Sequence, residues 1–170
     1  QKGGTVLSSS RGPVDKARAV DNLIARGVNI LFTVGGDGTQ RGANDLYQEA
    51  RRRGYALSVV GVPKTIDNDV GFVSRTFGFF SAVEEAARVL DCAHTEACSV
   101  PGGIGLVKLM GRHAGFVTAG ATVASQDVNF ALIPEVPFEL EAFLAALKQR
   151  MLAKSHAVIA VSEGAGQNLL

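Results

Sequence analysis

Two loops of the sequence combine glycines with acidic side chains, and each loop follows a short apolar run. The first, VGGDGTQRGA, covers residues 34–43, and the second, GVPKTIDNDV, covers residues 61–70. Glycine lets the backbone approach an anion closely, and the N-terminus of a following helix attracts negative charge. Carboxylates supply the oxygen ligands that Mg²⁺ prefers. This combination predicts a site that handles a phosphate group together with a magnesium ion.

In the first loop, the glycines at 35, 36 and 38 leave room for a phosphate, and Thr39 is expected to cap the next helix. Asp37 would repel a bare phosphate, so its presence there indicates a bridging Mg²⁺. An ordinary strand-to-helix turn capped by an aspartate is the alternative. The pattern is not GxGxxG, so it does not support dinucleotide binding.

In the second loop, Asp67 and Asp69 lie two residues apart, and Lys64 and Thr65 precede them. An Asx-rich turn is the simple interpretation. However, two carboxylates at a crowded strand end need cationic partners. A phosphoryl-transfer site would provide them, and one carboxylate would take the proton from a hydroxyl group.

The rest of the sequence predicts an α/β fold that brings these loops together. Strands are expected at 29–34, 57–62, 104–110, 130–135 and 156–164, and helices near 17–28, 39–53, 79–97, 114–124 and 140–151. This alternation predicts Rossmann-like parallel sheets with right-handed crossovers and helices on both faces. Ligands bind beyond the carboxyl ends of such strands, where two further loops, 111–115 and 163–166, also lie.

Composition excludes several classes of function. Among 170 residues, 17 Lys and Arg nearly balance 16 Asp and Glu, which gives no reason to expect nucleic-acid binding. We expect no membrane span and no signal peptide. Cys92 and Cys98 are interpreted as reduced core thiols, and the three scattered histidines, His94, His113 and His156, predict no metal site. We also expect the chain to be part of a longer protein.

Four motifs, GGDGT, PKTIDND, KLMGRHAGF and VSEGAG, resemble those of the phosphofructokinases, in the same order and spacing. The opening GGTVLSSSRG does so too, and the resemblance is strongest to ATP-dependent enzymes of plants, algae and protists. It implies the phosphofructokinase fold, with two lobes around a cleft. Residues 1–78 would belong to the nucleotide-binding lobe, without its first glycine-rich strand. Residues 79–170 would belong to the sugar-phosphate-binding lobe, without its C-terminal portion.

The resemblance also implies roles for individual residues. Asp67 would take the proton from the C1 hydroxyl of fructose 6-phosphate, and the other catalytic residues would be Thr65, Arg112 and Arg11. The substrate-binding residues would be Thr65, Ile66, Asp67, Met110, Gly111, Arg112 and Glu163. The nucleotide-binding residues would be Arg11, Gly12, Gly36, Asp37, Gly38 and Thr39, with Asp37 also holding Mg²⁺. Asp69 is a further acidic residue, whereas Arg41 and His113 receive no role.

The activity implied by the resemblance is phosphoryl transfer from ATP to fructose 6-phosphate in glycolysis. We expect an allosteric, homo-oligomeric enzyme of the cytoplasm, or of the plastid in a plant or alga, and an inactive fragment. Gly38 leaves room for the α-phosphate of a nucleotide, whereas Lys64 is typical of pyrophosphate-dependent enzymes. We give Gly38 more weight, because a side chain would exclude ATP while a lysine merely permits pyrophosphate. Alternatives are a pyrophosphate-dependent enzyme, an NAD or diacylglycerol kinase, and a non-catalytic subunit.

Overall fold

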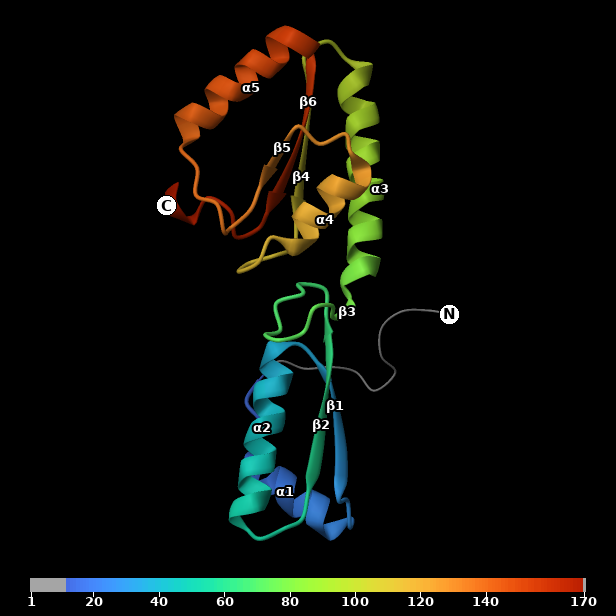
Figure 1. Cartoon of the computed structure of the whole chain (residues 1–170), viewed down its shortest axis with the longest axis vertical. Helices are drawn as coiled ribbons and strands as arrows, with labels where there is room; N and C mark the ends of the chain where they lie inside the picture. Colours follow the sequence, from blue (N-terminus) through green and yellow to red (C-terminus); the bar gives the residue numbers. More distant parts are fainter. Residues whose placement is uncertain (1–11, 170) are drawn as a thin grey trace. The chain divides into compact units, whose positions relative to one another are not determined.

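A computed structural model describes residues 12–169, and the chain divides into two compact units between Val62 and Pro63 (Figure 1). The first unit contains α1 (Lys16–Ala25), β1 (Ile30–Gly35), α2 (Asp37–Arg52) and most of β2 (Ser58–Thr65). The second contains β3 (Phe77–Gly78), α3 (Phe79–Ser99), β4 (Gly103–Leu109), α4 (Phe116–Ser125), β5 (Phe130–Leu132), α5 (Leu140–Lys154), β6 (His156–Ser162) and a short 3₁₀ helix (Gln167–Leu169). The assignment of residues 1–78 and 79–170 to two lobes around a cleft stays a prediction.

The expected α/β class is confirmed. Strand β2 pairs in parallel with β3, and β6 pairs in parallel with both β4 and β5. The sheet orders are β1-β2-β3 and β4-β6-β5. None of the helices within residues 12–169 has the length and apolar character that crossing a bilayer requires.

In the first unit, α1 and α2 pack side by side against one face of the strands (Figure 1). Their shared core consists of Val20, Ala50 and Leu57, against which Leu31 of β1 packs. The alternate side chains of β1, at Ile30, Phe32 and Val34, point the other way and are more than half exposed. Among the described residues, the helices of this unit therefore cover one face of its sheet.

Helix α2 begins directly after β1, and Gly36 is its N-cap residue. The prediction that Thr39 caps this helix is wrong, because Thr39 lies inside the first turn. The Thr39 side chain packs so closely against Gly35 that a side chain at position 35 would collide with it. The absence of a side chain at Gly35 thus allows the strand to turn tightly into the helix.

Gln40 holds the ends of β1 and β2 together. Its amide Nε2 donates to the carbonyl oxygens of Gly35, at 3.0 Å, and of Val62, at 3.1 Å. Any side chain at Gly61 would collide with the Gln40 amide, so the amide occupies space that this glycine leaves free. Gln40 therefore positions Val62, the residue of β2 immediately before the PKTIDND motif.

In the second unit, α3 and α4 cover one face of the β4-β6-β5 sheet, and α5 packs against β6 on the other face (Figure 1). The core between the helices and the sheet contains Ala86, Leu90, Val107, Val117, Ala121, Val158 and Ala160. Ala86 and Leu90 are the residues that α3 contributes to this core. Residues 157–160 of β6 are all buried, as expected for a central parallel strand.

The two cysteines are not in this core, so that prediction is wrong. Cys92 and Cys98 are both free and exposed on α3. A helical residue is rotated by about 100° from its neighbour, so the side chain two positions after buried Leu90 points away from the core. Cys98 likewise follows buried Ala97 and lies at the edge of the buried stripe.

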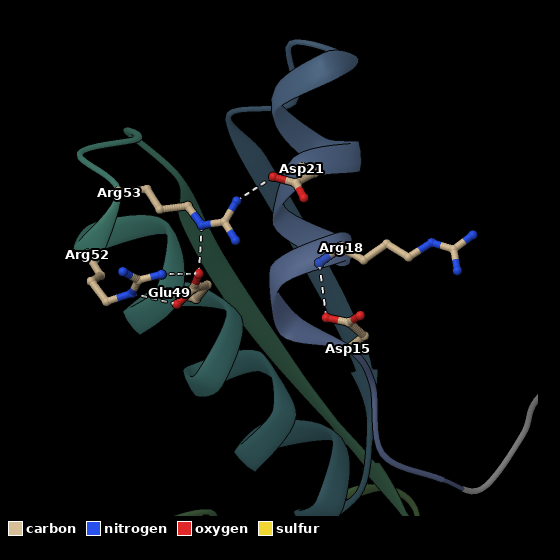
Figure 2. Close-up of polar contacts among 6 residues, drawn as sticks. All are labelled: Asp15, Arg18, Asp21, Glu49, Arg52 and Arg53. Carbon is tan, nitrogen blue, oxygen red and sulfur yellow. Dashed lines mark hydrogen bonds and ion pairs between the residues drawn. The ribbon is translucent and has the colours of Figure 1, made fainter.

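An ion-pair network joins the two helices of the first unit (Figure 2). Glu49 accepts hydrogen bonds from Arg52, at 2.8 and 2.9 Å, and from Arg53, at 2.6 Å. Arg53 also pairs with Asp21 of α1. The hydrogen bonds from Arg52 and then Arg53 lower the pKa of Glu49 from 4.5 to about 2.

A Glu49→Gln variant should therefore lose stability in a pH-dependent way. The pKa of Glu49 is lowered in the folded state, so its ion pairs contribute fully above the unfolded pKa of 4.5 and are lost as the pH falls toward about 2. The measurement is the urea unfolding midpoint of both proteins at several pH values. The variant should be less stable at pH 7, and the two curves should converge between pH 4.5 and 2. A difference that does not change with pH would contradict this role of Glu49.

Truncation of Gln40 to alanine should destabilise the first unit by about 1–3 kcal/mol, because two strand-end carbonyls lose their donor. Gln48→Ala is the matched control, since Gln48 is exposed on the same helix. Its effect should stay within about 0.5 kcal/mol. Equal free energies of unfolding for the two variants would show that Gln40 does not hold the strand ends.

Candidate functional site

The first functional loop lies between β1 and α2. Gly36 caps the helix, and the first-turn N–H groups, from Asp37 to Thr39, have no partner within the helix. Such N–H groups and the helix dipole together favour an anion. Of the predicted nucleotide-binding residues, Gly12, Gly38 and Thr39 line one cavity of about 680 Å³. Arg11, predicted to act beside them, lies outside the described residues.

Two basic residues that were not expected to have a role also line this cavity. Lys16 forms an ion pair with Asp45 at 2.8 Å, and Arg41 pairs with Asp37 one helical turn away. Arg41, which received no role from the sequence, is largely exposed, and its partner is Asp37. Both residues add positive charge at this cavity.

Asp37 fits the role of a magnesium ligand. Its carboxylate is 52% exposed, and its pairing with Arg41 leaves it on the surface of the unit. Mg²⁺ typically binds one or two carboxylates together with phosphate oxygens and retained waters, so one accessible carboxylate beside a phosphate-sized cavity is sufficient. A bound cation would compete with Arg41 for the Asp37 carboxylate.

Gly38 faces open space. Within residues 12–169, a Cβ atom built on Gly38 would meet no other atom within 4 Å. The fold therefore does not require glycine at this position of α2, where glycine is an intrinsically poor helix former. This openness agrees with the prediction that Gly38 leaves space for a ligand.

The second functional loop begins inside β2, because this strand extends through Lys64 and Thr65 rather than ending at residue 62 as predicted. Lys64 and Thr65 pair in register with Phe77 and Gly78 of β3, a short strand that was not expected from the sequence. Lys64 is exposed, and Ile66 lies half-buried beside Gly78. Pairing with β3 thus holds the backbone of the PKTIDND motif, in addition to the turn of the motif itself.

Side-chain hydrogen bonds hold the loop that follows. Asn68, in the left-handed conformation with φ of 55°, accepts a bond from the backbone N–H of Thr76 at 2.8 Å. The buried hydroxyl of Thr76 donates to the carbonyl oxygen of Thr65, also at 2.8 Å. The Thr65 hydroxyl in turn accepts from the backbone N–H of Asp67 at 3.2 Å. Asn68 and Thr76 are positioning residues that were not identified from the sequence.

Asp67 has the electrostatic environment of a base. Partial burial raises the pKa of its carboxyl, and the negative charges of Asp69 and Glu163 raise it further. The hydrogen bond with Thr65 and the nearby His113 act in the opposite direction without cancelling the rise. His113 therefore belongs to the surroundings of Asp67, although no role was predicted for it.

Parallel pairing brings the third and fourth loops together. Leu109 at the end of β4 pairs with Ser162 at the end of β6, so the loops that follow leave the sheet side by side. Arg112 Nε lies 4.0 Å from Glu163 Oε1, and both side chains are accessible. The predicted residues Met110 and Gly111 lie in the same loop as Arg112, and Met110 is exposed.

Close backbone contacts fix these two loops. The N–H of Gly164 donates to the carbonyl oxygen of Gly111 at 3.1 Å, and a side chain at Gly164 would collide with the Arg112 backbone. Gly111 has a φ of 133°, which favours glycine. Glu135, which was not singled out from the sequence, accepts a hydrogen bond from the N–H of Gly115 at 2.8 Å. In the sequence, Glu135 is the last residue of the predicted strand 130–135, and this position was the feature that could have drawn attention to it.

The second unit therefore brings three of the predicted site residues, Asp67, Arg112 and Glu163, near one another. Asp67 and Glu163 are close enough for their charges to interact, and Arg112 faces Glu163. A carboxylate base, a second carboxylate and an accessible guanidinium are suited to deprotonating a hydroxyl and binding an anionic, hydroxyl-rich substrate.

The chain is similar to known proteins along nearly its whole length. An ATP-dependent 6-phosphofructokinase of Trypanosoma brucei brucei is 54% identical over 166 residues, which are 98% of this chain and 34% of that protein. The ATP-dependent 6-phosphofructokinase 4, chloroplastic, of Arabidopsis thaliana is 48% identical over 171 residues, 99% of this chain and 32% of that protein. The chain thus spans about a third of the length of these relatives.

Solved structures give the same result for the fold. A pyrophosphate-dependent phosphofructokinase from Marinobacter aquaeolei matches with a TM-score of 0.85 and 31% identity, over 96% of this chain and 43% of that one. A Pichia pastoris phosphofructokinase matches with a TM-score of 0.80 and 26% identity, over 96% of this chain and 20% of that one. The family model described as Phosphofructokinase matches residues 1–169. The chain belongs to the phosphofructokinase family.

Proposed function

We propose that the protein containing this chain transfers a phosphoryl group from ATP to the C1 hydroxyl of fructose 6-phosphate, giving fructose 1,6-bisphosphate in glycolysis. The observation that carries the proposal is the environment of Asp67, a half-buried carboxyl with a raised pKa near Glu163 and His113. Family membership and the ATP-dependent relatives from a protist and a plant support the same activity.

Asp67 acts as the general base on the acceptor side. A raised pKa makes its carboxylate a stronger base than that of an ordinary aspartate. The proton of the sugar hydroxyl moves to a carboxylate oxygen of Asp67 as the hydroxyl oxygen forms its bond to the γ-phosphorus of ATP. The bond between that phosphorus and the oxygen bridging it to the β-phosphate breaks, and ADP leaves with that oxygen. Thr65 and Asn68 hold the Asp67 loop in place through their hydrogen bonds.

Glu163 and Arg112 bind the acceptor from the neighbouring loops. The Glu163 carboxylate accepts hydrogen bonds from sugar hydroxyls, and the exposed Arg112 guanidinium offers donors to phosphate oxygens. Met110, Gly111 and Ile66 complete the acceptor-binding set of this proposal. Positioning and charge neutralisation of this kind supply most of the catalysis in phosphoryl transfer.

On the donor side, the first-turn N–H groups of α2 and the backbone at Gly36 and Gly12 bind nucleotide phosphates. Lys16 and Arg41 add positive charge at the same cavity. Asp37 would hold Mg²⁺, which neutralises charge on the phosphate oxygens when it is bound. Thr39 and Arg11 stay in the nucleotide-binding set as parts of the proposal.

ATP is the proposed donor, and pyrophosphate is the second candidate. The open space at Gly38 supports ATP, because it leaves room for an α-phosphate. The exposed Lys64 favours pyrophosphate, and two structural neighbours carry pyrophosphate-dependent names. The NAD and diacylglycerol kinase alternatives rested on GGDGT alone, and the family assignment removes their support. A homo-oligomer, allosteric control and a cytoplasmic or plastid location are further parts of the proposal.

The donor assignment is tested by Gly38→Asp in the whole protein. The parent should turn over fructose 6-phosphate with ATP, and the variant should lose at least about tenfold in kcat/KM for ATP, because the added carboxylate repels the α-phosphate. The efficiency with pyrophosphate should change much less. Gln48→Asp is the matched control, since it adds the same charge at an exposed position of α2 that does not line the cavity.

Three outcomes would overturn these assignments. If the parent prefers pyrophosphate, or if Gly38→Asp changes both donors equally, Gly38 does not select ATP. If the parent turns over fructose 6-phosphate with neither donor while its fold is intact, the protein is the non-catalytic subunit.

A further inference from the structure

Three potential metal ligands gather on the second unit, away from the loops described above. His94 and Cys98 lie four residues apart on α3 and therefore share one face of that helix. His156 is the first residue of β6. The ligand atoms of these three side chains all lie within 4.8 Å of one another, and the two imidazole rings are 5.4 Å apart.

This cluster lies at the opposite end of the sheet from the phosphoryl-transfer residues. β6 begins at His156 and ends at Ser162, directly before Glu163. At about 3.3 Å per residue, the strand separates His156 from Glu163 by roughly 23 Å. The C-terminal end of α3 and the start of β6 meet at this end of the unit (Figure 1). The cluster is thus a separate site and does not depend on the proposed activity.

Hydrogen bonds orient both imidazole rings for metal binding. His94 Nδ1 lies 3.0 Å from Asp127 Oδ2, and His156 Nδ1 lies 3.0 Å from the carbonyl oxygen of Lys154. Each Nδ1–H therefore donates to oxygen, which leaves each Nε2 with a lone pair for a metal. Carboxylate or carbonyl partners of this kind commonly fix the tautomer of metal-binding histidines.

The surroundings leave room for an ion. Cys98 and His156 line a cavity of about 450 Å³, and the Cys98 side chain is exposed. Tetrahedral zinc places nitrogen and sulfur ligands about 3.3–3.7 Å apart, so the side chains need to close by about 1 Å. Arg150 Nη2 lies 3.4 Å from His156 Nε2, and this long contact must open when a cation binds.

We propose that His94, Cys98 and His156 form a binding site for a zinc-class transition-metal ion. Two imidazole nitrogens and one thiolate sulfur suit a borderline-soft ion, whereas Mg²⁺ prefers oxygen. The fourth position faces solvent and would be filled by water. Asp127 acts as the positioning residue for His94, and Arg150 limits affinity by its positive charge.

The test uses the whole, untagged protein in excess Mg²⁺, so that oxygen-ligand sites are occupied. Co²⁺ is added as a spectroscopic probe, and Zn²⁺ stoichiometry is measured by equilibrium dialysis. We expect one ion per chain at this site, with a thiolate-to-cobalt charge-transfer band and intense tetrahedral bands in the visible region. Cys98→Ser should abolish the charge-transfer band, and His156→Asn should remove the tetrahedral bands.

Matched variants separate this site from nonspecific binding. Cys92→Ser removes the other exposed thiol of α3 and should leave spectrum and stoichiometry unchanged. Asp127→Asn should weaken binding by about 10–100-fold, and Arg150→Gln should strengthen it. Co²⁺ spectra without thiolate character, or a charge-transfer band that survives Cys98→Ser, would overturn the proposal. Circular dichroism of each variant checks that its fold is intact.

Discussion

The parallel ladder between β4 and β6 is the interaction on which the placement of Arg112 and Glu163 depends. It runs in register from Gly103 and His156 to Leu109 and Ser162, and α3 and α4 bury one of its faces. Next to the ladder, the Thr118 hydroxyl of α4 lies 2.7 Å from the Ser162 hydroxyl. This hydrogen bond connects α4 to the end of β6. Because both strands end at the same edge, the loops that follow place Arg112 and Glu163 opposite each other.

The acidic residues differ in their electrostatic surroundings. Asp67 is partly buried beside two other carboxylates, so its pKa rises and its basicity increases. Asp37 lies exposed at a helix N-terminus with Arg41 as its partner, which suits an accessible metal ligand. Glu49 is held by two arginines and its pKa falls to about 2, so it serves stability. The same functional group thus has three electrostatic environments that its neighbours determine.

Most of the fold could be predicted from the sequence because apolar runs and helical periods alternate clearly. The loop residues were also predictable, since glycines and acidic side chains directly after buried strands are typical of sites that bind phosphate and Mg²⁺. The roles of Gln40, Asn68, Thr76 and Glu135 could not be predicted, because each depends on a backbone group distant in sequence or across a turn. The grouping of His156 with His94 and Cys98 could not be predicted for the same reason. Several strands and helices separate His156 from the other two residues in sequence.

We infer that neighbouring negative charge raises the pKa of Asp67 and makes this residue a better base. The most direct measurement is the pH dependence of kcat in the whole protein and in Asp69→Asn. Activity requires the ionised carboxylate, so the rate should fall as the pH decreases through the raised pKa of Asp67. Removing the charge of Asp69 lowers that pKa, so the acidic limb of the profile should move to lower pH in the variant. An acidic limb that stays at the same pH would contradict the claim.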